Sequence, residues 1–286
     1  MDYYKEKGLH ALANVIHVDK TGWFHGHIGA SLITGAYLLE SGLLSSYAET
    51  SLQARLDIII ESYSDYFQPI TRSCFTDIMP IEKALNACTK QQNLSGYGFI
   101  YGTLALRVLH QFPELADSNI TNAIAQLIHN CQKDKWAKYY DLNNRHNYQS
   151  ISCQTITVFD ICQLAVEKSA QPMFINSHQP FFTGEKIHGL THAYAIYQLN
   201  QLGYEHIAHD ALKHTIKQLE FAAHTSGTTI TAEAKAINLH DPAIWNEDCA
   251  NKNQLKLAYS FCEMALELTL DSRCLHKLWE AISTKV

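Results

Sequence analysis

The sequence predicts an all-α fold, a single domain of about ten to twelve helices packed around a central cavity. Only 6 prolines and 13 glycines interrupt the 286 residues, and apolar residues between them recur at the i, i+3, i+4 and i+7 spacing of amphipathic helices. Convincing strand alternation is absent, because the β-branched run at 155–159 continues into helical spacing. No composition shift marks a linker, so one all-helical domain is expected over 1–286.

The helices are expected, in chain order, at 3–17, 24–41, 43–64, 80–91, 97–111, 117–132, 150–168, 186–202, 204–225, 230–238 and 252–283. Gly42 and Gly203 each follow such a segment and are expected to cap its C-terminus. Pro80 opens one segment, and Pro113 follows the end of another. The longest connections are rich in Pro, Asn, Asp, Ser or aromatic residues and are candidates for function: 65–79, 133–149, 169–185 and 239–251.

Composition and charge argue against several kinds of partner. The formal net charge is −6 and the 22 Lys and Arg residues are scattered, so nucleic acid is not expected as a partner. No apolar stretch reaches the roughly 18 residues that a membrane span needs. The polar start at 1–7 lacks the apolar core of a signal peptide, which favours a cytoplasmic protein. The oligomeric state is left open.

Familiar cofactor motifs are also missing. None of the 8 cysteines forms a C-x-x-C pair, so they are expected to be small core residues rather than zinc ligands. Gly-x-Gly-x-x-Gly and P-loop patterns are absent, which leaves no nucleotide or flavin signature. The 16 histidines motivate a search for a histidine site. His206, His209 and His214 fall in a polar helical stretch and are expected to face solvent.

The most informative pattern is a His-Gly pair at the start of an apolar helix. It occurs at 25–29 as His-Gly-His-Ile-Gly and at 188–192 as His-Gly-Leu-Thr-His, and 97–101 carries the related Tyr-Gly-Phe-Ile-Tyr. Imidazole is the commonest metal ligand and the usual proton carrier near neutral pH. We expect these three motif helices to lie inside the fold, around a common centre.

The spacing of the histidines within each motif decides whether both side chains can reach the same site. His188 and His192 are four residues apart and lie on one apolar helix face, either as a shared ligand or acid-base pair or as two core histidines. His25 and His27 point about 200° apart on a helix and reach one site only if the helix begins between them, at Gly26. Otherwise one histidine supports the other, or both lie at the surface.

Other groups with helical spacing have plainer interpretations. The small residues at 29–31 leave room for a ligand or for a close helix. Tyr97 and Tyr101 repeat the i, i+4 geometry and can ligate, donate protons or pack. The carboxylates of Asp57, Glu61 and Asp65 are expected to lie on a solvated helix face rather than to form a site.

The run Phe24-His25-Gly26-His27-Ile28 resembles the Phe-His-Asn-His-Ile motif of the questin oxidase-like family, with Gly26 in place of Asn. Thr191-His192-Ala193 is similar to a late motif of that family. Tyr97 and Tyr101 stand where the family has two histidines. Lys256 is similar to a C-terminal lysine of the family, and Asn253 stands where the family has a histidine three residues earlier. The resemblance covers about half the chain in short motifs, and this chain is shorter than typical members.

The resemblance implies an all-helical, non-haem iron oxygenase that acts with O₂ on an apolar, aromatic or polyketide-like small molecule. His25 and His192 are expected to bind the implied Fe(II) directly, His27 and His188 either to bind it or to support the ligands, and Lys256 to be a carboxylated ligand. His27, His188, Tyr97 and Tyr101 are candidate catalytic residues, and Trp23, Phe24 and Tyr194 are candidates for the substrate pocket. With two tyrosines in place of histidines, either the set of metal ligands is reduced or the family fold is reused with different chemistry.

Two other functions stay open from the residues alone. The histidines can do acid-base work without metal, in a cyclase, isomerase or hydrolase. Alternatively, the chain is a helical protein that binds a small molecule without chemistry. Metal analysis distinguishes the iron oxygenase from these two functions. Turnover after removal of metal distinguishes the metal-free enzyme from the non-catalytic binding protein.

Overall fold

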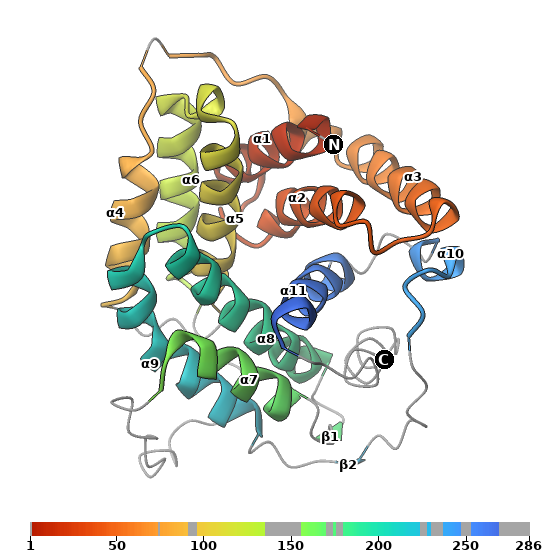
Figure 1. Ribbon diagram of the computed structural model, residues 1–286. Helices are drawn as coiled ribbons and strands as arrows, with labels where there is room; N and C mark the ends of the chain where they lie inside the picture. The colour runs from red at the N-terminus through yellow and green to blue at the C-terminus, as the bar shows by residue number, and fades with distance from the viewer. Residues whose placement is uncertain are drawn as a thin grey trace.

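The computed structural model is all-helical, as the sequence predicts (Figure 1). It describes residues 2–73, 75–90, 96–134, 156–169, 174–175, 180–223, 228–229, 237–246 and 253–268. The α-helices are α1 (Asp2–Val18), α2 (Gly26–Glu40), α3 (Ser46–Ser62), α4 (Met79–Cys88), α5 (Tyr97–Gln111), α6 (Ser118–Cys131), α7 (Val158–Ser169), α8 (Pro180–Gln201), α9 (Glu205–Ala223), α10 (Pro242–Trp245) and α11 (Asn253–Glu267). Two short 3₁₀ helices, η1 (Ser64–Phe67) and η2 (Pro113–Leu115), and one antiparallel pair of two-residue strands, β1 (Phe174–Ile175) and β2 (Thr228–Thr229), complete the described elements.

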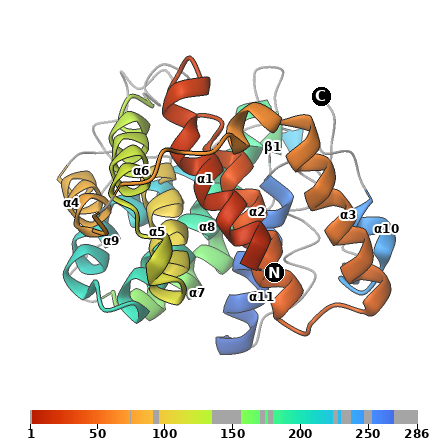
Figure 2. The ribbon, with the colours of Figure 1, turned by 90° about the horizontal axis from the view of Figure 1, so that it is seen from above.

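Four helices form the centre of the fold. α2 packs against α5, α5 against α8, α8 against α11, and α11 against α2, so that the four enclose a common core (Figure 1). α1 covers α2 and α6, while α4 and α6 pack beside α5. α7 and α9 pack on α8, and α3 lies against α2 and α10 at the opposite side of the molecule (Figure 2).

The three motif helices α2, α5 and α8 all belong to this central group, as predicted. Every residue of α2 from Gly26 to Leu39 is buried, which fits a helix that is apolar on all sides. In α8 the described residues 188–196 are buried as well. The sequence motifs therefore mark helices that lie inside the bundle rather than on its surface.

Small residues bring α1 and α2 unusually close together. A Cβ atom added to Gly29 would lie 2.5 Å from the carbonyl oxygen of Gly8, and one added to Gly8 would lie 2.8 Å from the carbonyl oxygen of Gly29. Real Cβ atoms do not approach backbone oxygens this closely, so only glycine fits at both positions. Of the two interpretations left open for 29–31, the close helix is the one that the structure shows.

Capping residues explain several helix ends. The Ser45 and Asp117 side chains accept hydrogen bonds from the first-turn backbone of α3 and α6. Gly42 and Gly203 follow α2 and α8 with φ of +68° and +89°, the left-handed conformation predicted for C-terminal caps. Pro80 lies in the first turn of α4, also as predicted.

Two helices begin at other positions than expected. In the segment expected at 150–168, residues 156–157 are not helical and α7 begins at Val158, where Thr157 and Asp160 exchange hydrogen bonds that cap the helix; residues 150–155 lie outside the described part. Helix α8 begins at Pro180, well before the predicted start, since proline is well tolerated in a first turn.

Two further predicted helices are covered only in part. The helix expected at 252–283 ends at Glu267 within the described residues, and 269–283 lies outside them. Of the helix expected at 230–238, residues 237–238 are not helical and the remainder lies outside the described part.

The described surface and core agree with the compositional expectations. No helix in the described part of the chain is long and apolar enough to cross a membrane. The four described cysteines are buried and are not joined in disulfides, as expected for core residues: Cys88, Cys131, Cys162 and Cys262.

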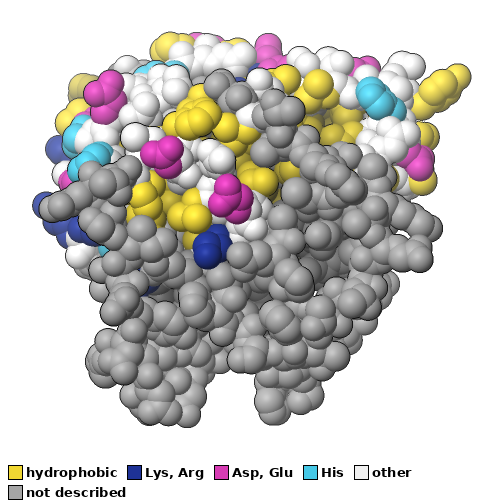
Figure 3. Space-filling model, turned by 60° about the horizontal axis from the view of Figure 1, so that its bottom comes forward, with side chains coloured by type: hydrophobic (Ala, Val, Ile, Leu, Met, Phe, Trp, Pro, Cys, Tyr) yellow, Lys and Arg dark blue, Asp and Glu magenta, His cyan; other side chains and the backbone are white. Residues whose placement is uncertain are grey.

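On the face in Figure 3, acidic side chains lie singly among apolar and polar ones in the described part. Asp57, Glu61 and Asp65 are exposed, which confirms the solvated helix face.

Candidate functional site

Five side chains from the four central helices meet in one buried group, which we call the central cluster. His27 comes from α2, Tyr97 and Tyr101 from α5, His188 from α8 and Lys256 from α11. All five are at most 6 % exposed. Segments that span almost the whole chain therefore place two imidazoles, two phenols and an amine in contact, away from bulk water.

His27 makes the central contacts of this cluster. Its Nδ1 atom lies in hydrogen-bonding contact with Lys256 Nζ, and its ring is 6.0 Å from the His188 ring, with the two planes 16° apart. The His27 and Tyr97 ring centres are 4.9 Å apart, and Lys256 Nζ lies 5.8 Å from the Tyr97 ring centre. The helix begins at Gly26, and this start directs His27 inward.

The two tyrosines differ in their hydroxyl partners. Tyr97 Oη lies 3.0 Å from His188 Nε2 in a hydrogen bond. The Tyr101 ring packs on Gly26, where an added Cβ would lie 2.5 Å from it, and its hydroxyl has no hydrogen-bond partner among the described residues. Burial raises the pKa of Tyr101 well above its ordinary value, so this phenol stays protonated. Tyr97 is thus placed for proton exchange with His188, and Tyr101 for packing.

His192 is buried beside His188 but faces a different helix. Its Nδ1 atom lies 2.7 Å from Gln218 Oε1, and its Nε2 atom lies 3.3 Å from Thr215 Oγ1, both on α9. Its ring stacks on Phe99. Desolvation lowers the pKa of His192 to about 4, against a Gln218 hydrogen bond that acts in the opposite direction. His192 is therefore a neutral core histidine in this structure, with both ring nitrogens in hydrogen bonds.

This burial predicts a pH-dependent stability. An unfolded histidine takes up a proton as the pH falls below 6.5, whereas folded His192 stays neutral down to about pH 4. Its contribution is present above pH 6.5 and is lost as the pH falls toward 4, by up to about 3 kcal/mol. Urea unfolding should show the stability gap between wild type and His192→Gln shrinking from pH 7 to pH 4.5. A gap that does not change with pH would contradict a buried neutral imidazole.

His25 lies outside the central cluster, although it precedes His27 by only two residues. Its Nδ1 atom is 2.6 Å from the Tyr66 hydroxyl and 3.8 Å from Asp19 Oδ2, and its side chain is 40 % exposed. Asp19 also accepts the His25 backbone N–H, which fixes the turn before α2. The helix start between the two histidines separates them: one faces the core and the other faces the surface.

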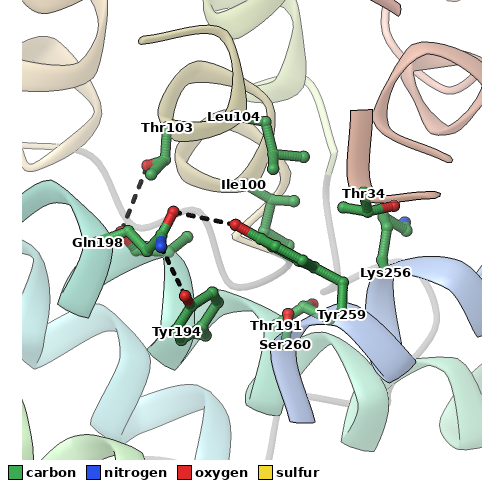
Figure 4. A pocket seen from close by; sticks show the side chains of 11 residues that line it. Thr34, Ile100, Thr103, Leu104, Thr191, Tyr194, Gln198, Lys256, Tyr259 and Ser260 are labelled. Carbon is green, nitrogen blue, oxygen red and sulfur yellow. Dashed lines mark hydrogen bonds between the residues drawn. The ribbon is translucent and has the colours of Figure 1, made fainter. Parts of the chain in front are cut away.

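A small cavity adjoins the cluster at Lys256 (Figure 4). Its volume of about 10 Å³ leaves room for roughly one water molecule. Hydroxyl groups of Thr34, Thr191 and Ser260 lie around it, and Ile100 and Leu104 give it an apolar side. The cavity lies between the four central helices, and as it stands it does not hold an aromatic ring.

The far wall of this cavity is a polar network that the sequence motifs did not reveal. The Tyr259 hydroxyl donates to Gln198 Oε1, and Gln198 Nε2 donates to the Tyr194 hydroxyl, as the dashed lines in Figure 4 show. Tyr194 donates in turn to Glu263, 2.8 Å away, and Arg107 bonds to Tyr259. Tyr194, predicted to line a substrate pocket, lies in this wall and away from Trp23 and Phe24.

The buried polar partners of the site could have been found from polar residues that fall on the apolar stripe of a helix. Gln218 and Thr215 follow Ala211 at helical spacing on the buried face of α9. On the same helix His214 is only 4 % exposed and bonds to the Thr89 carbonyl, so the prediction that it faces solvent was wrong. Its neighbours His206 and His209 are exposed, as predicted.

An open groove lies elsewhere, between α1, α6 and the chain at 69–71. Its volume is about 580 Å³, and amide side chains including Asn14, Asn119 and Gln126 line it. None of the site residues predicted from the sequence borders this groove, and its polar lining does not adjoin the central cluster.

The implied iron ligands are only partly brought together. Among the described residues, no group of three or more His, Cys, Asp or Glu side chains is placed to hold a metal ion. His27, His188 and Lys256 converge, whereas His25 and His192 bond to other side chains. The resident donors therefore do not form the implied ligand set in this arrangement.

Comparisons with known proteins do not assign the chain: no family model, no curated protein and no solved structure matches it.

Proposed function

We propose that this protein is an enzyme that transfers protons to and from a neutral, apolar carbonyl compound, as an isomerase or cyclase does. The observation that carries the proposal is the pair of contacts in the central cluster, between Lys256 Nζ and His27 Nδ1 and between the Tyr97 hydroxyl and His188 Nε2. Each contact joins a group that can give a proton to one that can take it. Their burial excludes bulk water from this exchange.

The two contacts suggest complementary roles. The His27–Lys256 pair would take a proton from the carbon next to a carbonyl group, breaking that C–H bond. The Tyr97 hydroxyl would give its proton to the carbonyl oxygen, which yields an enol, and the imidazolium form of His188 would return a proton to Tyr97 and become neutral. Return of the proton from the His27–Lys256 pair to a different carbon, with the enol proton going back, completes an isomerisation without any co-reactant.

Deuterium exchange tests this function whatever the final product is. In D₂O, the chelator-treated protein should catalyse the exchange of hydrogen for deuterium at the carbon next to the carbonyl group of apolar aromatic ketones that carry a C–H bond there. Tyr97→Phe should slow the exchange by about 10²-fold or more, because the proton donor is lost. Tyr101→Phe should leave it near wild type, since that hydroxyl has no partner among the described residues. Equal rates in both variants, or no exchange at all, would contradict the proposal.

An iron-dependent oxygenase is the second candidate, and a specific observation favours it. Residues singled out by the family resemblance in separate segments, namely His27, Tyr97, Tyr101 and Lys256, lie together in the fold. Anaerobic Fe(II) reconstitution should then give close to one iron per chain, lost in His27→Ala, and O₂ uptake with an apolar substrate. Protein that retains no iron would remove this candidate. Failure of both assays would leave a protein that binds a small molecule without chemistry.

A further inference from the structure

One large apolar ring beside the central cluster stays exposed to water. Phe24 is 46 % exposed, and its ring centre lies 5.6 Å from that of His27, in an edge-to-face arrangement with the planes 86° apart. Trp23 contacts both Phe24 and Tyr97, at 5.7 and 5.4 Å between ring centres. Phe24 therefore lies between solvent and His27, at the start of α2.

The cavity that adjoins the cluster at Lys256 does not admit a large molecule. Its volume is about 10 Å³, far below the roughly 300–1,000 Å³ of small-molecule pockets. Of the described rings in contact with His27, Phe24 is the exposed one, which makes it the candidate point of entry for a reactant larger than water.

The backbone around Phe24 is held in place, so its side chain is the part that can move. The Phe24 N–H donates to Thr21 Oγ1 at 3.0 Å, and the next N–H, of His25, donates to Asp19 Oδ2 at 2.9 Å. Exposed side chains change rotamer within picoseconds to nanoseconds. Rotation of Phe24 would uncover the edge of His27 without disturbing the helix start.

We propose that Phe24 controls access to the central cluster and selects flat aromatic rings, which can take its place against His27 and Trp23. This inference rests on the proposed function, because a route to the central cluster serves a reactant only if the reaction takes place there. A flat aromatic ring recovers the edge-to-face contacts that Phe24 gives up, whereas a saturated ring of similar size recovers only apolar contact.

Carbethoxylation of histidines by diethyl pyrocarbonate, read by mass spectrometry, tests the access route. His27 should be labelled about tenfold faster in Phe24→Ala than in wild type, because labelling of a buried group follows the population of its open state. Exposed His209 and fully buried His192 serve as internal references. Phe159→Ala removes an equally exposed ring on α7 and should leave His27 unchanged. Equal His27 labelling in wild type and Phe24→Ala would overturn the proposal.

A matched pair of probes tests the ligand class. 2-Naphthol should protect His27 of the wild-type protein from labelling, and its saturated counterpart decahydro-2-naphthol should not. Equal protection by both compounds, or by neither, would overturn the selection for flat aromatic rings. These labelling results do not depend on turnover, so a failure of the deuterium-exchange assay would reject the proposed function and leave the access route standing.

Discussion

Replacing Lys256 with methionine is expected to lower turnover by about 10²–10⁴-fold, the range usual for loss of a general acid or base. Methionine keeps an unbranched chain of similar length, so the buried space stays filled. What disappears is the nitrogen atom in contact with His27 Nδ1 and, with it, the shared proton of the proposed His27–Lys256 pair. The measurement is the deuterium-exchange rate per folded molecule, with urea unfolding to determine the folded fraction.

A second buried lysine provides the matched control. Lys5 is fully buried on α1, where it bonds to Glu40 and Gln111 and lies 4.4 Å from the Tyr37 ring centre, away from the central cluster. Lys5→Met should lower the free energy of unfolding, because Glu40 loses its partner, and should keep the exchange rate per folded molecule. If Lys256→Met retained full activity, the His27–Lys256 contact would be structural and the proposed function would fall.

The fold class followed from the sequence because helical periodicity is a local property. Helix α5 coincides with its predicted range, since a left-handed Gly96 precedes it and Pro113 follows it. The burial of His188 and His192 also followed from their place on the apolar stripe of one helix. The start of α7 did not, because its position depends on a cap between Thr157 and Asp160 rather than on periodicity.

The partners of each histidine could not be predicted from spacing within one helix. His188 meets Tyr97 on α5, whereas His192, one turn later, meets Gln218 on α9. The tilt and register of neighbouring helices decide between these partners, and both are set by packing across long stretches of sequence. Lys256 was predicted as a site residue only through the family resemblance. Its contact with His27 joins residues 229 positions apart, so no local pattern in the sequence indicates it.

Gly29→Ala is expected to destabilise the protein by about 2–3 kcal/mol, as overpacking in a rigid core does. Its new Cβ would lie 2.5 Å from the Gly8 carbonyl oxygen and 2.8 Å from the Leu12 backbone nitrogen. Backbone atoms cannot rotate away, so α1 and α2 must move apart. Gly98→Ala on α5 is the matched control, because its nearest contacts of 3.3–3.5 Å need only a small shift. That variant should gain up to about 1 kcal/mol of helix propensity, which largely offsets the contact.

The same substitution should also disturb the site, because Gly29 lies two residues after His27 on α2. Separation of α1 from α2 would displace the start of α2 relative to α11, and the His27–Lys256 contact depends on that placement. We therefore expect Gly29→Ala to lower the exchange rate per folded molecule, and Gly98→Ala to change it less. Thermal and urea unfolding of both variants, with exchange rates corrected for the folded fraction, check this. Equal stability and equal rates for the two variants would show that the close approach of α1 and α2 can relax, and that it does not position His27.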